Sequence, residues 1–124
     1  MSRASERGAV AVEFAIIAPV LVMLLLGIME FSRAYNTQAS LSAAAREGVR
    51  VMAITGDQTA ARTAAENAAV SLTPALTDSN ISFGGAPCSP GAQISIAVTY
   101  TLSTLTGIAG PFTMTGQGAM LCGG

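Results

Sequence analysis

Residues 9–29 read AVAVEFAIIAPVLVMLLLGIM, and Glu13 is the single charged residue in this run. The run is about 21 residues long, and at roughly 1.5 Å per residue a helix of that length spans the ~30 Å hydrocarbon core of a bilayer. We therefore predict one transmembrane helix over residues 9–29, and membrane lipid is its first expected partner.

The charges on the two sides of this run predict its orientation. Arg3 and Arg7 precede the run, whereas Glu30 and Arg33 cancel each other after it. An excess of Lys and Arg marks the cytoplasmic side of a membrane helix. We therefore expect residues 1–8 to form a short cytoplasmic leader. The chain would be a single-pass protein of the cytoplasmic membrane with its C-terminal domain outside.

Two other interpretations of the apolar run are weaker. A secretory signal peptide needs a small-x-small cleavage site, but Ile28 is followed by Met-Glu-Phe-Ser-Arg. A buried core helix of a soluble protein needs partner surface, and the remaining residues offer too little of it. Insertion into a membrane is the interpretation that the length and the flanking charges favour.

The composition argues against several classes of function. Apolar residues make up 51% of the 124 residues and charged residues only 10%, less than half the usual share of a soluble domain. The net charge of −1 gives no electrostatic basis for binding nucleic acid. Histidine, on which metal sites and acid–base catalysis usually depend, is absent. We expect no enzyme activity, catalytic residue, metal, cofactor or small-molecule substrate.

Glu13 is the anomaly of the apolar run. A carboxylate at the bilayer centre costs about 2.5–3.5 kcal/mol and usually marks function, although near the interface it can simply reach the water. The stretch Gly8-Ala-Val-Ala-Val-Glu13-Phe14 resembles the processing site of the type IV pilin superfamily. In that superfamily a membrane aspartyl peptidase cuts after a glycine, and the fifth residue of the mature chain is a glutamate.

The resemblance implies a cleavage site between Gly8 and Ala9. Glu13 would then be the fifth residue of the mature chain and, with Phe14, an assembly residue. Cleavage would give Ala9 a new α-ammonium at the membrane surface. The Glu13 carboxylate of a neighbouring subunit would pair with it, so that each charge offsets the desolvation of the other.

Two further segments, GIMEFSRAY at 27–35 and AAREGVR at 44–50, extend the match. With the processing site they resemble the TadE-like family of the tight-adherence (Flp) pilus over residues 7–52. The resemblance implies a pilin-like or pseudopilin component, in the membrane or in an extracellular pilus. It implies a prepilin peptidase, other pilin subunits and the secretion ATPase platform as partners. The alternative is an uncleaved, signal-anchored binding module outside the membrane.

The juxtamembrane charges Glu30 and Arg33 allow two interpretations. At a spacing of i, i+3 they suit an ordinary ion pair on an exposed helix, worth a few tenths of a kcal/mol. A dedicated contact with a partner protein is the other interpretation.

The helix is expected to continue outside the membrane over residues 30–55. Leu41, Ala45, Val49 and Met52 recur at steps of four, four and three, which predicts one apolar helical stripe. Gly56 breaks the pattern, and Asp57 can cap a second helix over about 58–72.

The last part of the chain changes to the period of a strand. Apolar residues alternate with small polar ones at 94–100 and 112–120, the latter interrupted by Gly116 and Gly118, and a shorter strand is predicted at 81–83. The linkers at 84–92 and 107–111 are rich in Gly and Pro, as turns require. The expected fold class is α+β. A small domain over 56–124 would hold the second helix and a short antiparallel β-sheet.

Cys88 lies in the first of these linkers, and Cys122 comes just after the last predicted strand. In the oxidising compartment predicted by the topology, one disulfide between them is the expectation. Two free thiols with a metal or redox role are the alternative, but the sequence offers no partner ligand for them.

Overall fold

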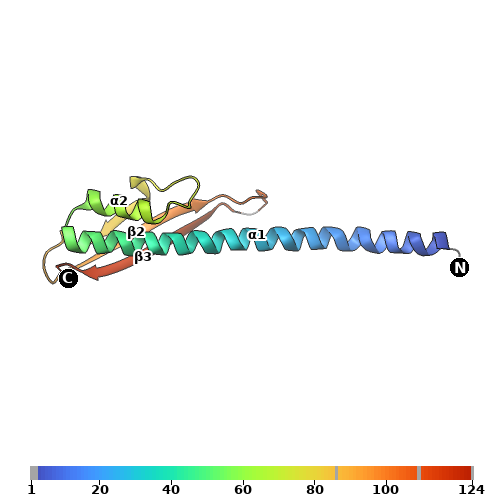
Figure 1. Cartoon of the computed structure of the whole chain (residues 1–124), viewed down its shortest axis with the longest axis horizontal. Helices are drawn as coiled ribbons and strands as arrows, with labels where there is room; N and C mark the ends of the chain where they lie inside the picture. Colours follow the sequence, from blue (N-terminus) through green and yellow to red (C-terminus); the bar gives the residue numbers. More distant parts are fainter. Residues whose placement is uncertain (1–2, 86, 109, 124) are drawn as a thin grey trace. The chain divides into compact units, whose positions relative to one another are not determined.

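The computed structural model describes residues 3–85, 87–108 and 110–123. The chain forms two compact units, Met1–Arg33 and Ala34–Gly124, which we call the N-terminal and C-terminal units. The fold class is α+β, as predicted. In chain order the elements of Figure 1 are α1 (Arg3–Thr55), α2 (Gln58–Ala68), the 3₁₀ helix η1 (Asp78–Asn80), β1 (Ile81–Gly84), β2 (Gln93–Leu102) and β3 (Phe112–Leu121).

Helix α1 begins at Arg3, earlier than the predicted start at Ala9. The short stretch before Ala9 contains good helix formers, and Glu6 lies in the first turn, where a negative charge interacts favourably with the helix dipole. The helix ends where the sequence predicted. Gly56 adopts a left-handed φ of +68°, and its N–H donates to the carbonyl of Met52 at 2.8 Å.

Helix α2 begins as predicted and ends earlier than predicted. The Asp57 side chain accepts a hydrogen bond from the Thr59 N–H at 2.9 Å and so caps the helix. The sequence predicted helix to about residue 72, but α2 stops at Ala68. The chain leaves the helix here because Leu72 and Leu76, which follow, turn into the core and are 7% and 6% exposed.

The three predicted strands form one antiparallel sheet in the order β1-β2-β3. The register pairs Ile81 with Val98 in β1–β2, and β2 pairs with β3 along its whole length, from Gln93↔Leu121 to Leu102↔Phe112. Every second residue of β2 is buried, which confirms the predicted alternation. The buried set comprises Ile94, Ile96, Val98, Tyr100 and Leu102.

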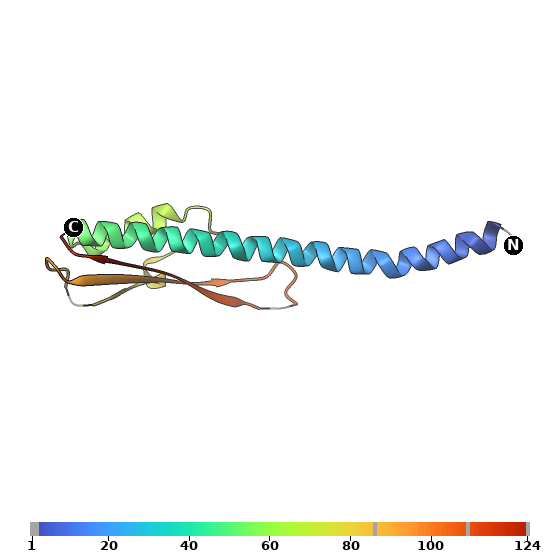
Figure 2. The ribbon, with the colours of Figure 1, turned by 90° about the horizontal axis from the view of Figure 1, so that it is seen from below.

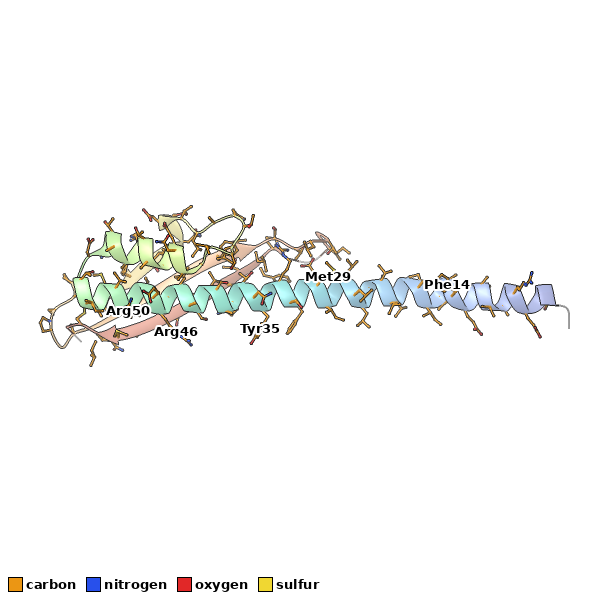
Figure 3. The ribbon with its side chains drawn as sticks, viewed as in Figure 1. Phe14, Met29, Tyr35, Arg46 and Arg50 are labelled. Carbon is orange, nitrogen blue, oxygen red and sulfur yellow. A yellow bond between two sulfur atoms is a disulfide. The ribbon has the colours of Figure 1, made fainter. Side chains whose placement is uncertain are left out.

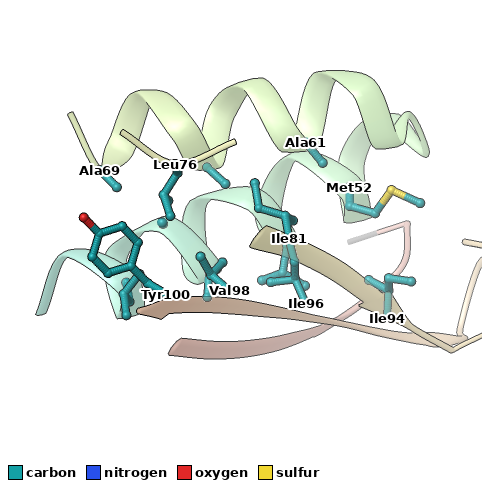
Figure 4. Close-up of a cluster of buried hydrophobic side chains, with 14 of the residues drawn as sticks. Met52, Ala61, Ala69, Leu76, Ile81, Ile94, Ile96, Val98 and Tyr100 are labelled. Carbon is teal, nitrogen blue, oxygen red and sulfur yellow. The ribbon is translucent and has the colours of Figure 1, made fainter. Parts of the chain in front are cut away.

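The core of the C-terminal unit lies where α1, α2 and the sheet meet (Figure 4). The predicted stripe of α1 is confirmed, since its four residues are at most 3% exposed. Ala61 and Ala65 of α2 are fully buried, and their small side chains allow α2 to approach α1 closely.

Strand β3 packs directly on the backbone of α1 within this unit (Figure 2). A Cβ placed on Gly116 would overlap the carbonyl group of Leu41, and on Gly118 it would lie 3.0 Å from the carbonyl oxygen of Ala45. The two glycines are therefore the positions at which the strand touches the helix, and they are more than interruptions of a strand pattern.

Candidate functional site

The N-terminal unit presents an uncovered apolar helical surface. An 18-residue stretch of α1 is apolar enough to cross a membrane, and none of that stretch is buried. Phe14 is 70% exposed and Met29 53% exposed (Figure 3). A core helix of a soluble protein would have such side chains covered. The surface therefore fits a single-pass membrane protein.

The four residues of the predicted processing and assembly segment all lie on α1, within its first three to four turns. Among the described residues, nothing lies within 4 Å of the position that a Cβ on Gly8 would take. The Glu13 side chain is exposed, and within the described ranges it has no hydrogen-bonding or ionic partner. A group that pairs with this carboxylate must therefore come from outside the described chain.

Glu30 and Arg33 are three residues apart on α1, and both are partly buried. Residues at this spacing are neighbours on a helix surface. The ion-pair interpretation of the two charges remains a prediction.

One face of the AAREGVR segment is part of the core. Ala44 and Ala45 are fully buried, and Gly48 is buried beside them. A Cβ on Gly48 would lie 2.8 Å from Cδ1 of Ile96 and 3.2 Å from Cβ of Ala65. Glycine costs a helix about 1 kcal/mol relative to alanine, and here close packing of α1 against α2 and β2 offsets that cost.

The other face of the segment carries charges on the surface (Figure 3). Arg50 contacts Glu47 with two hydrogen bonds, Nη2 to Oε1 at 2.6 Å and Nε to Oε2 at 3.2 Å. This hydrogen bonding lowers the pKa of the Glu47 carboxyl. Arg46 is exposed, and its side chain has no partner among the residues that the structure describes. The segment therefore combines a packing face with a free cation.

Cys88 and Cys122 form a disulfide, with a Cα–Cα distance of 5.6 Å. Backbone hydrogen bonds hold the same end of the unit together, from Cys122 N to Ala92 O at 2.8 Å and from Gly123 N to Ala53 O at 3.0 Å. The disulfide expected from the sequence is present and joins the β1–β2 connection to the segment after β3, while the hydrogen bond of Gly123 holds that segment beside the end of α1.

Arg62 has a structural role that the sequence analysis missed. Its Nη1 donates to the carbonyl oxygens of Asp78 at 2.7 Å and Ile81 at 2.6 Å. The guanidinium also lies 4.9 Å from the centre of the Phe83 ring. Arg62 therefore ties α2 to η1 and β1. A lone arginine in an alanine-rich helix was the available signal, but its partners are distant in sequence.

Glu66 lies near a second carboxylate. Hydrogen bonding with Asp78, together with partial burial and the charge of Asp78, raises the pKa of the Glu66 carboxyl. A carboxyl whose pKa is raised by folding stabilises the fold at a pH below its unfolded pKa, and this contribution is lost as the pH rises through the folded pKa. At neutral pH the two carboxylates therefore repel each other.

We expect Glu66→Gln to remove this repulsion and to stabilise the C-terminal unit at neutral pH by a few tenths of a kcal/mol. The gain should shrink as the pH falls through the raised pKa of Glu66, because protonation of this carboxyl also removes the repulsion. Thermal unfolding at neutral pH and at acidic pH measures this gain in stability. Glu47→Gln is the matched control. It should change the stability in the opposite direction, because Arg50 lowers the pKa of Glu47. A Glu66→Gln gain that is the same at both pH values would contradict the prediction.

Within the described ranges, no three His, Cys, Asp or Glu side chains are grouped so that they could hold a metal ion. The structure is that of an α+β protein whose N-terminal part is one exposed apolar helix. Residues 8–50 match the model of the family described as TadE-like protein. This match confirms the TadE-like resemblance expected from the sequence.

The TadE-like family is a family of pilus components and is not a known enzyme family. No curated protein and no solved structure gives a significant match. The matched residues include Glu13 and the buried Ala44, Ala45 and Gly48 of α1, whereas α2 and the sheet lie outside the match.

Proposed function

We propose that this chain is a pilin-like structural component of a tight-adherence pilus or of its envelope machinery. Residues 9–29 cross the cytoplasmic membrane, the N-terminus lies in the cytoplasm and the C-terminal unit lies outside. Other pilin subunits are the partners. The observation that carries the proposal is the uncovered apolar helix. Inside the segment matched by the family, this helix holds an acid, Glu13, that has no partner among the described residues.

In this proposal a prepilin peptidase cuts between Gly8 and Ala9. Both residues are helical in α1, so the peptidase must first unwind the helix N-terminus. Helix ends open at little cost when few tertiary contacts hold them. The open space beside Gly8 would leave the peptidase room to reach the backbone.

The N-terminus of the membrane-extracted protein tests the proposal directly. We expect a chain that begins at Ala9 in cells with the peptidase, and one that keeps residues 1–8 in cells without it. Gly8→Leu should block cleavage, because a side chain would obstruct the approach to the scissile bond. Gly27→Leu, at a second helical glycine with nothing within 4 Å, is the matched control and should be cleaved normally.

A protein that retains Met1 in working pili would contradict processing. A protein that keeps its leader and takes no part in pili would favour the uncleaved, signal-anchored binding module instead. Intact mass distinguishes these cases, because cleavage removes residues 1–8.

A further inference from the structure

The β2–β3 loop, residues 103–111, lies at the end of the C-terminal unit where α1 enters it. Gln38 Nε2 donates to the carbonyl of Thr115 at 3.0 Å, so residue 38 of α1 lies beside residue 115 of β3. From Gln38 back to Ala34 is about 6 Å along a helix, and from Thr115 back to Phe112 is about 10 Å along a strand. The loop therefore lies at the Ala34 end of the C-terminal unit. Figure 2 shows it at the end of the sheet opposite the C-terminus.

The direction of β3 supports this placement. Gly116 lies against Leu41, and Gly123 N donates to Ala53 O at 3.0 Å, so β3 and this part of α1 run in the same direction. The start of β3 and the loop before it are consequently at the Ala34 end of the unit.

Large apolar side chains are exposed on the described residues of this uncharged loop and at the start of β3. Ile108 is 88% exposed, Leu105 is 52% exposed and Phe112, at the start of β3, is 48% exposed. No charged residue follows Asp78 in the sequence. Exposed apolar residues that gather at one place usually mark an interaction site.

Two backbone N–H groups at the tip of the loop have hydrogen-bond acceptors within the loop. The N–H of Gly107 donates to Thr104 Oγ1 at 3.0 Å, and the N–H of Ile108 donates to Thr106 Oγ1 at 3.4 Å. A backbone N–H that leaves water without a partner costs free energy. These internal hydrogen bonds lower the cost of moving the tip out of water.

We propose that the β2–β3 loop docks on the outer surface of the membrane and places Leu105 and Ile108 at the boundary between head groups and acyl chains. The proposal rests on the proposed function, in which residues 9–29 span the bilayer. A lipid surface is the occupant because α1 leaves the unit at this same end and reaches the apolar run within a few residues. Tyr35, which is 70% exposed here, is of a type enriched at membrane interfaces.

The absence of tryptophan from the chain allows a direct test. The variant Ile108→Trp carries a single indole on the loop. We reconstitute the full chain in phosphatidylcholine vesicles with and without brominated acyl chains. The expected result is a blue-shifted emission that brominated lipid quenches and aqueous iodide does not. Leu105→Trp is a second reporter on the same loop and should behave in the same way.

Two further variants serve as controls. Leu24→Trp lies within the apolar run and should be quenched by brominated lipid if the run is inserted. Ile54→Trp replaces a residue that is 62% exposed near the C-terminal end of α1. Its indole should be quenched by iodide and not by brominated lipid.

The outcomes separate the loop proposal from the proposed function. If the Leu24→Trp indole is quenched by lipid and both loop indoles are quenched by iodide, docking is overturned and the membrane span stands. A blue-shifted loop indole that brominated lipid leaves unchanged indicates contact with protein and also overturns docking. If the Leu24→Trp indole is not quenched by lipid, the proposed span itself fails, and docking fails with it.

Discussion

Gly116→Val is expected to destabilise the C-terminal unit by at least about 3 kcal/mol, the upper end of the usual cost of overpacking. Even the Cβ of the new side chain would overlap the carbonyl group of Leu41 and approach the backbone nitrogen of Ser42 to 2.8 Å. These are backbone atoms inside a helix, so they cannot rotate away as the end of a flexible side chain can. Either β3 must move off α1 or the helix must deform.

Strand propensity predicts the opposite sign for the same substitution. Valine is a better strand former than glycine, but the whole β-propensity scale spans only about 1 kcal/mol. Because the packing penalty is larger, the net effect should be a loss of stability. The sign of the measured change therefore decides whether Gly116 is a weak point of the strand or the contact at which the strand meets the helix.

Thermal unfolding of the full chain in detergent, followed by near-ultraviolet circular dichroism, measures this effect. For a unit of this size each kcal/mol corresponds to roughly 4–8 °C in the midpoint, so a fall of more than about 12 °C is expected. Gln117→Val is the matched control, since residue 117 is exposed on the other face of β3, and its effect should stay within ~0.5 kcal/mol. Gly118→Ala should fall between the two. A stabilising Gly116→Val would refute the contact.

Hydrophobic periodicity predicted the elements whose burial follows a regular pattern. The α1 stripe is buried as its spacing indicated, and the alternation in β2 matches its buried and exposed faces. Such patterns report the water-facing and core-facing sides of an element, and this property is encoded locally. The cap at Asp57 was predictable for the same reason, because its partner is the N–H of Thr59.

The features that escaped prediction depend on contacts between segments that are distant in sequence. Nothing near Gly116 in the sequence indicates that the backbone of Leu41 lies against it. The early end of α2 depends on where Leu72 and Leu76 find the core, and the role of Arg62 depends on carbonyls in η1 and β1. The early start of α1 is different, because it depends on the helix propensity of the residues before Ala9, which is a local property of the sequence.

The AAREGVR segment shows how one short helical segment can pack in the core with one face and present charges on the surface with the other. Its small residues let α2 and β2 approach α1, and its charged residues point away from the core. The sequence showed the residue types and their helical spacing, but the two functions became separable only when the partners of each face were known.

Glu13→Gln is the second large effect that we expect, and it concerns assembly. The substitution keeps the size of the side chain and removes its charge. In the proposed pairing, it leaves the α-ammonium of a neighbouring Ala9 without a counter-charge in the membrane. Breaking a buried ion pair by removal of one partner costs about 3–5 kcal/mol. Since about 1.4 kcal/mol is a tenfold change in an equilibrium constant, incorporation should fall at least about a hundredfold.

Cleavage should be spared by the same substitution, because the carboxylate acts after the new N-terminus exists. The measurement therefore needs two readouts in the same cells, the N-terminal residue of the membrane protein and its amount in pili or in the assembled complex. Glu6→Gln is the matched control. It makes the same chemical change in the same helix, but Glu6 belongs to the leader that is removed, so assembly should be unchanged.

Each other outcome has its own physical meaning. If Glu13→Gln assembles normally, the carboxylate merely reaches the water at the cytoplasmic face and no pairing exists. If Glu13→Gln is not cleaved, the acid acts during recognition by the peptidase, and the exposed Glu13 side chain serves that enzyme instead of a neighbouring subunit. A variant that is cleaved normally and assembles poorly is the result that only a charge contact formed after processing produces.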